Sequence, residues 1–559
     1  MAKAKTNQAF FQSPENARSR ALLKGMGYTT RDLKQPRIGV ANSWGETSPG
    51  HFHLRALGDA VKAGIWQAGA TPFEFNSFGQ CPMDIGGHGI RYDTATRDIV
   101  AAEIEAAAYL HMFDGMVMIS SCDKNVPANL LAACRLDIPV IIVTGGSMLA
   151  GRSGEEDTDT TTLDAACWAF GVGETPISRE EMDRLEDSVC PGPGSCALLG
   201  TANTMQCLTE AMGLSLPGVA TTPAVSALKL RQAKQTGQQI VELIEAGITS
   251  HQIITRESLS NAIRVLHAIG GSTNAIIHLL AMAWEMRFDQ DINLAFIEKL
   301  GQETPCIANV RPSGPFTVGD FDEAGGIPAV MKRLEEMLNK DVLTVTGQSL
   351  AVNLEPARVA NPAIIKPLED PVSEGGLAVL SGSLAQSAVV RPTVIVDEMK
   401  QHKGPARVFD GQEEALEALR AGMVQAGDVV IVRFEGPRGG PGLTEVFKVI
   451  GFMRGLGLES KCALVTDGKI SGFAKGPFIC QVSPEAAEGG PLAVVRNGDM
   501  IEMDIANRKL DLLIPDEELQ ERIQNWTPPP PRVNDGFLTV YARLANPATK
   551  GAGINLRMD

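Results

Sequence analysis

Three consecutive side chains with metal-binding chemistry follow an apolar run of the sequence. Cys122, Asp123 and Lys124 come directly after Met116–Ile119 and Ser120-Ser121. A thiolate suits a soft metal, a carboxylate suits Mg²⁺, and a lysine can be a cation or, once modified, a ligand. A buried cysteine beside a solvated acid–lysine pair is the alternative interpretation.

Two further cysteines, Cys190 and Cys196, flank the segment Pro-Gly-Pro-Gly-Ser. Glycine and proline fix a tight loop whose backbone can approach a cofactor closely. The spacing is not a zinc pattern, because no second short-spaced Cys/His pair accompanies it. The ligands of an iron–sulfur cluster can come from scattered loops, which favours that cofactor. A turn with two buried cysteines is the alternative.

Two glycine-rich segments lie near the C-terminal end of the chain. Glu435 and Glu445 bracket a loop in which six of the seven residues at 436–442 are Gly or Pro. Such a loop exposes N–H groups that bind carboxylates or phosphates, and both acids are candidate metal ligands. Ser471 precedes a glycine and lies between Lys469 and Lys475, whose charges favour an alkoxide, so it is a candidate base or nucleophile. The alternatives are a structural loop and an ordinary turn serine.

The elements that must position these residues change in kind along the chain. Between Pro36 and about residue 225, apolar runs alternate with alanine-rich helical stretches, which predicts an α/β structure with a parallel sheet. Sites in such sheets lie beyond the C-terminal ends of the strands. The predicted strands are Ile38–Asn42, Met116–Ile119 and Val140–Val143, and the predicted helices are Leu54–Ala68, Ile99–His111 and Ala128–Arg135. Residues 226–345 are predicted to be mainly helical.

Prolines crowd residues 356–371, which predicts a linker over 361–375 between an N-terminal domain, 1–360, and a C-terminal domain, 376–559. Short β-rich runs separated by turn residues follow, and they predict a β-barrel-like domain. The predicted strands are Leu377–Leu380, Val389–Val396, Ala406–Phe409, Val429–Phe434, Ala463–Thr466, Leu492–Val495 and Met500–Ile505.

Composition limits the classes of function. The 559 residues carry a net charge of −16, which argues against a surface that binds duplex nucleic acid. The sequence has no apolar run of membrane-spanning length and no secretory signal at its start, so we expect a cytoplasmic protein without membrane partners. In a reducing compartment the ten cysteines should not form a disulfide framework. Functional cysteines should therefore be metal ligands or nucleophiles.

Taken together, the four motifs resemble those of the dihydroxy-acid dehydratase/6-phosphogluconate dehydratase family. The resemblance runs from about residue 14 to the C-terminus and includes Pro49–Leu54, His267–Asn274 and Ser483–Pro491. It implies an α/β N-terminal domain with a parallel sheet, a β-barrel-like C-terminal domain, and a homodimer or a dimer of dimers.

The resemblance also implies roles for the candidate residues. Cys122 and Cys196 would hold a 2Fe-2S or 4Fe-4S cluster with an open position on one iron. Asp123 and Glu445 would hold Mg²⁺, and Lys124 would join them as a carbamate. Residues 1–360 would be the domain that binds the cluster and Mg²⁺, and the C-terminal domain would supply Glu445 to the metal and Ser471 as the general base.

Several positions depart from the family pattern. Many members have a cluster cysteine where this chain has Gly50, so we expect Cys81, ahead of Cys190, to be the third cluster ligand. Pro82 replaces the aspartate that holds Mg²⁺ in the family, and Asp84 is the expected substitute. In the fourth motif Lys469 replaces a usual arginine. His51 and His53 are predicted either to contact substrate or to be structural.

The function implied is the loss of water from a 2,3-dihydroxy carboxylic acid to give a 2-keto acid. Dihydroxy-acid dehydratase of valine and isoleucine biosynthesis is the first hypothesis. A sugar-acid dehydratase acting on an aldonate or a 6-substituted gluconate is the second. An inactive paralogue that keeps the cluster as a sensor is the third. The expected partner is a small-molecule substrate, with no nucleic acid.

Overall fold

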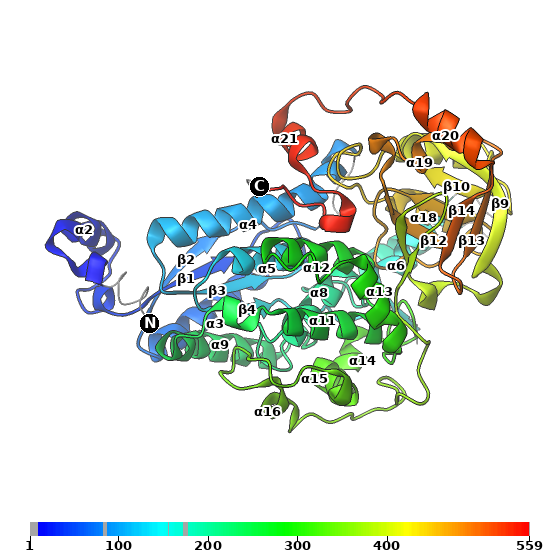
Figure 1. Cartoon of the computed structure of the whole chain (residues 1–559). Helices are drawn as coiled ribbons and strands as arrows, with labels where there is room; N and C mark the ends of the chain where they lie inside the picture. The colour runs from blue at the N-terminus through cyan, green and yellow to red at the C-terminus, as the bar shows by residue number, and fades with distance from the viewer. Residues whose placement is uncertain (1–8, 82–86, 155, 171–176, 558–559) are drawn as a thin grey trace.

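The N-terminal half of the protein is built on a four-stranded parallel sheet, with strand order β2-β1-β3-β4. The computed structural model describes residues 9–81, 87–154, 156–170 and 177–557. Every residue of β1, β3 and β4 is buried, because helices cover both faces of the sheet. Figure 1 shows α4 and α5 on one face and α3 and α9 on the other. The bounds are Arg37–Asn42 for β1, Thr71–Asn76 for β2, Gly115–Ser120 for β3, Val140–Thr144 for β4, Leu54–Gln67 for α3, Tyr92–His111 for α4, Asn125–Arg135 for α5 and Ala227–Ala246 for α9.

Helices α3 and α9 cross at two glycines. A Cβ on Gly64 would lie 2.0 Å from the carbonyl oxygen of Lys234, and one on Gly237 would lie 2.1 Å from that of Val61. Real Cβ atoms do not approach other atoms so closely, so the two backbones meet only because both positions lack a side chain.

The C-terminal half is an eight-stranded sheet with order β14-β13-β9-β10-β11-β12-β8-β7. Its central pairs, β9 with β10, β10 with β11 and β11 with β12, are parallel, and the outer pairs are antiparallel. The bounds are Ala378–Leu380 for β7, Ser387–Val390 for β8, Gln401–Phe409 for β9, Val429–Val432 for β10, Ala463–Thr466 for β11, Phe478–Ser483 for β12, Met500–Asp504 for β13 and Lys509–Leu512 for β14.

This sheet curls into a barrel-like structure whose ends meet. Ser381, just after β7, donates its N–H to the carbonyl of Arg508 over 2.9 Å and accepts the N–H of Leu510 over 3.0 Å. The first and last strands are therefore joined. Curling in this way leaves a sheet with few unpaired edge groups.

The predicted architecture agrees with the structure, and two predicted strands are largely wrong. An α/β unit with a parallel sheet is followed by a barrel-like sheet, as expected. Of residues 389–396, only 389–390 are in a strand, because β8 ends at Val390 and Pro392–Val394 form a 3₁₀ helix. Residues 492–495, predicted to be a strand, belong largely to helix α19 (Pro491–Val494). Pro491 occupies the first turn, where its fixed φ suits a helix and its missing N–H costs nothing. Strands β2, β12 and β14 were not predicted.

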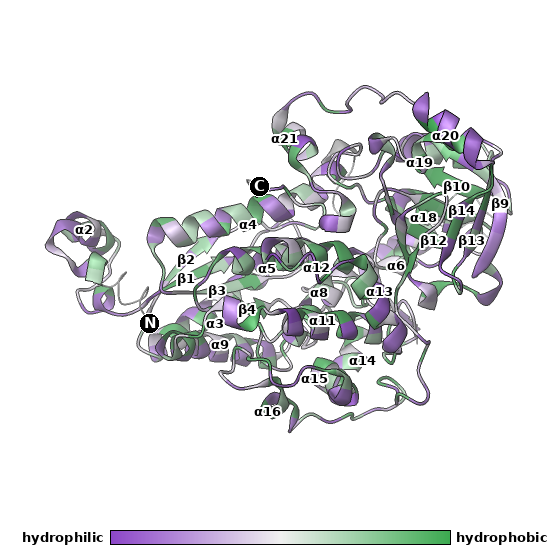
Figure 2. Cartoon of the chain, in the orientation of Figure 1, coloured by the Kyte–Doolittle hydropathy of each residue, from purple (hydrophilic) through white to green (hydrophobic). Residues whose placement is uncertain are grey.

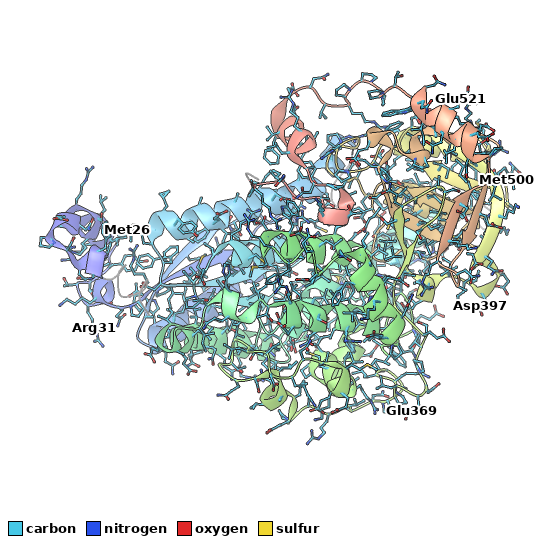
Figure 3. All side chains as sticks on the ribbon, in the orientation of Figure 1. Met26, Arg31, Glu369, Asp397, Met500 and Glu521 are labelled. Carbon is cyan, nitrogen blue, oxygen red and sulfur yellow. The ribbon has the colours of Figure 1, made fainter. Side chains whose placement is uncertain are left out.

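Two segments extend beyond the two sheets. Helix α2 (Ala17–Gly25) projects away from the body of the molecule, where Figure 3 labels Met26 and Arg31. At the other end, α21 (Gly536–Leu544) and the residues after it return to pack on α4. There Arg97 donates to the carbonyl of Gly551 over 3.0 Å, and the N–H of Ile554 donates to Asp98 over 3.0 Å.

Hydrophobic residues concentrate in the strands and in the inward faces of the helices (Figure 2). Among the described residues, no helix is long and apolar enough to cross a membrane.

The remaining helices of the N-terminal half are α6 (Thr160–Ala169), α7 (Arg179–Ser188), α8 (Thr201–Ala211), α10 (Ser250–Ile253), α11 (Arg256–Ala268), α12 (Asn274–Glu285), α13 (Leu294–Glu303), α14 (Val318–Glu323), α15 (Gly326–Arg333) and α16 (Leu350–Leu354). Those of the C-terminal half are α17 (Gln412–Arg420), α18 (Phe447–Gly455) and α20 (Asp516–Gln524). A small hairpin joins β5 (Gly151–Ser153) to β6 (Glu156–Thr158).

Candidate active site

One cavity, with about 40 Å³ of free space, brings together most of the residues singled out from the sequence. It lies where loops of the α/β half meet loops of the barrel-like half. Its walls include three cysteines, two acids and the candidate base, namely Cys81, Cys122, Cys196, Asp123, Glu445 and Ser471. Five separate segments, far apart in the sequence, therefore converge at this point.

Cys122 reaches the cavity from the loop that follows β3. Its backbone is left-handed, with φ of 54°, a conformation that is uncommon for a residue with a side chain. A Cβ on Gly50 would lie 2.2 Å from the Cys122 sulfur. The loop after β1 therefore passes directly beside this thiol, and glycine at position 50 makes room for it.

Cys196 is held by the first turns of helix α8. The side-chain amide of Asn203 donates to the carbonyls of Cys196 and Leu198, over 2.5 and 2.7 Å. Ser195 donates to the Asn203 oxygen over 2.7 Å, and Gln206 donates to Ser195 over 2.9 Å. This network fixes the loop on which the sequence places Cys196.

The two contenders for the third thiol lie in different surroundings. Cys81 lines the cavity with Cys122 and Cys196, whereas Cys190 is exposed to solvent. The geometry thus favours Cys81, as the sequence analysis expected. Asp84, the expected substitute magnesium ligand, lies outside the described residues.

Three thiols facing one cavity fit an iron–sulfur cluster. Such clusters are held by cysteine thiolates, and their ligands are spread over several irons rather than converging on one ion. Burial raises the pKa of Cys196 far above its ordinary value, and the nearby Cys81 adds to the effect. Without a metal this thiol keeps its proton, and a bound metal is what deprotonates such a ligand.

Ser471 lies in the loop after β11, against the start of α8. A Cβ on the neighbouring Gly472 would come within 2.7 Å of the Thr201 nitrogen and 2.8 Å of the Gly200 Cα. The first N–H groups of a helix have no partner within the helix and carry partial positive charge. That charge favours an anion near Ser471, either an alkoxide or a substrate carboxylate.

Four buried charged side chains and the partly exposed Asp123 form a cluster beside Ser471, and we call it the five-charge cluster: Asp93, Asp123, Lys124, Glu445 and Lys469. The Lys469 nitrogen lies 2.5 Å from a Glu445 oxygen and 2.5 Å from an Asp93 oxygen. The Lys124 nitrogen lies 3.3 Å from Asp93 and 3.7 Å from Asp123. Each lysine therefore contacts two of the three carboxylates.

The cluster sets the charge state of its members. Burial opposes the ionised form of Asp93, but Lys124 and Lys469 outweigh it and lower the pKa of Asp93. Burial likewise disfavours the Lys469 ammonium, yet Asp93 and Glu445 outweigh it and raise the pKa of Lys469. The pKa of Asp123, unlike that of Asp93, is raised, because burial raises it more than Lys124 lowers it.

The described residues do not fit the magnesium site implied by the family resemblance. Lysine ammoniums contact the acids that would bind Mg²⁺, and no three Asp, Glu, His or Cys side chains in the described ranges are grouped to hold one ion. Mg²⁺ requires free oxygens in near-octahedral geometry. Magnesium binding and carbamylation of Lys124 therefore stay predictions.

Asp93 was missed by the sequence analysis. It lies in the first turn of α4, 376 residues before its partner Lys469, and no local pattern marks it. Gln80 donates to its second oxygen over 3.1 Å. The only sequence signal was Lys469 itself, which stands where the family usually has arginine.

Glu435, proposed from the sequence as a metal ligand, belongs to a different network. It accepts the N–H of Gln412 over 3.1 Å and pairs with Arg532 over 3.2 Å. Nearby, Asp467 accepts backbone N–H groups of the same loop, and Glu485 accepts others. These acids fix the loop between Phe434 and Glu445.

The histidines of the first loop contact main-chain atoms. His51 Nε2 lies 3.2 Å from the carbonyl oxygen of Ser121, and His53 Nε2 lies 2.9 Å from that of Gly145. Of the two roles considered, these contacts support the structural one, because each ring ties the loop after β1 to the loop after β3 or β4.

Comparison with known proteins relates the whole chain to one family. Residues 35–353 match the N-terminal region of dihydroxy-acid/6-phosphogluconate dehydratases, and residues 363–552 match the C-terminal region. A dihydroxy-acid dehydratase of Methanothrix thermoacetophila is 49% identical over 545 residues, covering 96% of this chain and 98% of the relative. Proteins of the same name are 46% identical in Acetivibrio thermocellus, over 96% of this chain and 97% of the relative, and in Ignicoccus hospitalis, over 97% and 99%.

Proposed function

The chain belongs to the dihydroxy-acid/6-phosphogluconate dehydratase family, and from this membership we propose that it removes water from a 2,3-dihydroxy carboxylic acid to give a 2-keto acid. The protein is a dehydratase, and its full-length relatives are named dihydroxy-acid dehydratases. The observation that carries the proposal is the cavity in which three thiols, Glu445 and Ser471 meet. We assign it to valine and isoleucine biosynthesis.

The cofactor we propose is an iron–sulfur cluster held by Cys81, Cys122 and Cys196. When bound, a cluster with one iron free of cysteine supplies a Lewis acid for the departing C3 hydroxyl. Because the ligands are three rather than four, the protein leaves room for that hydroxyl. No step is derived from Mg²⁺, since lysines contact the acids that would hold it.

Ser471 is proposed to take the proton from C2 of the substrate. A free serine hydroxyl is far too weakly acidic to lose its proton, so its surroundings must stabilise the alkoxide. The start of α8 supplies fixed N–H dipoles beside the Ser471 loop, and their partial positive charge faces an anion there. The same charges favour the substrate carboxylate and the enolate that forms when the proton leaves. Tautomerisation of the resulting enol gives the keto acid without a redox change.

The substrate class is tested by turnover. Protein reconstituted anaerobically with iron and sulfide is assayed with 2,3-dihydroxyisovalerate, gluconate and 6-phosphogluconate, with keto acid as the readout. We expect the branched-chain dihydroxy acid to have the highest kcat/KM. Preference for a sugar acid would contradict the assignment and support the sugar-acid alternative. An intact cluster without turnover of any substrate would support the inactive sensor.

Ser471→Ala tests the base. We expect at least a hundredfold loss of kcat, on the order of what a positioned general base contributes. The visible absorbance of the cluster should not change, because Ser471 is not one of the proposed ligands. Ser381→Ala, an exposed serine at the barrel closure, is the matched control and should retain activity. Full activity of Ser471→Ala would assign the proton to another residue.

Three further expectations remain proposals. We propose that residues 1–360 form the cluster-binding domain, that 361–375 are the linker and that 376–559 carry the base. We propose a cytoplasmic location. A homodimer or dimer of dimers is proposed from the family resemblance, and light scattering should give a mass of at least twice 59.5 kDa.

A further inference from the structure

Lys469 is fixed against Glu445 by the main chain as well as by charge. Residues 445 and 469 form a parallel β-bridge, in which the N–H of Val446 donates to the Lys469 carbonyl over 2.9 Å and the Lys469 N–H donates to Thr444 over 3.0 Å. The two side chains therefore start from adjacent backbones. Their contact at 2.5 Å follows from this pairing rather than from a flexible side chain reaching across solvent.

The second partner of Lys469 comes from the other half of the molecule. Asp93 is fully buried in the first turn of α4. That turn is pressed onto the loop before Glu445, since a Cβ on Gly442 would lie only 1.8 Å from the Arg91 carbonyl oxygen. Lys469 thus lies between Glu445 and Asp93, and its ammonium occupies the place between two carboxylates where a bridging cation would bind.

We propose that the Lys469 ammonium, and not a divalent cation, is the cation that serves Glu445 in this chain. The proposal rests on the proposed function and specifies how the site of that dehydratase is charged. Glu445 then forms an ion pair with Lys469 instead of coordinating a metal, and its role is to hold Lys469 beside the substrate.

The charges of the five-charge cluster support this assignment. Three carboxylates and two ammoniums leave one net negative charge, so the two lysines already offset most of the charge of the acids. A divalent cation added to the same five groups would leave one net positive charge and would place a second cation close to Lys469. Binding it would require the ammonium to leave Glu445, although the β-bridge holds the two residues together.

The proposal requires Lys124 to be an ammonium as well. A carbamate on Lys124 would replace a positive charge with a negative one and would restore a strong preference for a divalent cation. Its nitrogen is buried and lies 3.3 Å from an oxygen of Asp93. The two lysines therefore act together to neutralise the cluster.

The test measures cation binding directly, with Mn²⁺ as the probe, in the reconstituted full-length protein. Free Mn²⁺ is followed by electron paramagnetic resonance during titration of the wild type, Glu445→Gln and Lys469→Met. We expect the wild type and Glu445→Gln to bind Mn²⁺ equally weakly. Lys469→Met should bind one Mn²⁺ per chain at least about tenfold more tightly, because it frees Glu445 and Asp93. That gain should vanish in the double variant Lys469→Met/Glu445→Gln.

Lys229→Met is the matched control, because Lys229 is an equally buried lysine outside the site whose ammonium contacts the Val219 carbonyl. It should not gain a Mn²⁺ site. A wild-type site that Glu445→Gln abolishes would overturn the proposal, and so would a folded Lys469→Met that gains nothing. If Lys469→Met does not fold, the Mn²⁺ affinities of the wild type and Glu445→Gln decide alone: equal weak binding supports the proposal, and tighter binding by the wild type overturns it.

A second measurement addresses Lys124. Protein equilibrated with carbon-13 bicarbonate should show no carbamate resonance that Lys124→Arg removes, and such a resonance would overturn the proposal. Neither measurement needs turnover. A failed substrate assay would therefore reject the proposed function and leave this inference standing. A Glu445-dependent Mn²⁺ site in the wild type would reject this inference and leave the proposed function standing.

Discussion

The three thiols of the cavity come from three separate loops, so single substitutions can separate ligands from bystanders. We expect Cys81→Ser, Cys122→Ser and Cys196→Ser each to lower iron and labile sulfide per chain after anaerobic reconstitution, because each removes one thiolate. Cys190→Ser should keep both, since Cys190 is exposed and Cys81 lines the cavity. Iron, sulfide and visible absorbance are the readouts. Cluster loss in Cys190→Ser with retention in Cys81→Ser would reverse the assignment.

At the scale of residues, the sequence singled out candidates where chemistry is carried by a local pattern, and their roles stay predictions. Cys122, Cys196, Glu445 and Ser471 all stand in short motifs, and the structure brings all four to one cavity. Asp93 could not be found in this way, because its partners lie in other loops and its helix turn is ordinary. A buried ion pair is a property of two distant positions, and a single sequence shows neither burial nor pairing.

At the scale of elements, the crossing of α3 and α9 offers a test of packing. Gly237→Ala would place a Cβ 2.1 Å from the Val61 carbonyl oxygen, so the helices must separate. We expect a loss of about 1–3 kcal/mol in the free energy of unfolding, as for overpacked cores. Denaturant titration with circular dichroism measures it.

Gly25→Ala is the control for that experiment. Nothing lies within 4 Å of the position where its Cβ would be, at the end of the projecting helix α2. Alanine favours a helix over glycine, so stability should stay the same or rise slightly. Equal losses in the two variants would show that the α3–α9 contact is not the cause.

The elements that the sequence predicted well are those in which buried positions carry apolar residues. The strands β1, β3 and β4 are buried throughout and read as continuous apolar runs. The edge strand β2 contains Pro72 and Glu74 and has mixed burial, so its pattern is weak. Residues 492–495 are apolar and buried, so their composition suits a strand as well as a helix, and Pro491 favours the helix that begins there.

At the scale of the whole molecule, two buried acids predict how stability depends on pH. Burial raises the pKa of Asp467 to about 6 and that of Glu485 to about 8, and repulsion between neighbouring acids adds to both. In the unfolded chain both acids ionise near pH 4. These two acids therefore hold extra protons in the folded protein between these values, and their contribution to stability falls as pH rises from about 4 through about 8.

Urea midpoints across that range measure the effect. Glu485→Gln removes one titrating group, so the fall in stability between about pH 6 and about pH 8 should become smaller. Glu521→Gln, an exposed acid on α20 labelled in Figure 3, should leave the slope unchanged. An identical slope in the wild type and Glu485→Gln would show that Glu485 ionises normally.

The return of the C-terminal segment onto α4 has a consequence for when the enzyme matures. Arg97 and Asp98, which contact Gly551 and Ile554, lie one turn beyond Asp93, so the helix that supplies Asp93 to the five-charge cluster is anchored by residues more than 350 positions after Cys196. A ribosome adds about 5–20 residues per second, so these residues emerge tens of seconds after the cysteine loops. We therefore expect the proposed cluster to be loaded only after residues 551–554 have emerged. Ribosome-bound or C-terminally shortened chains should stay without metal even when all three thiols are present.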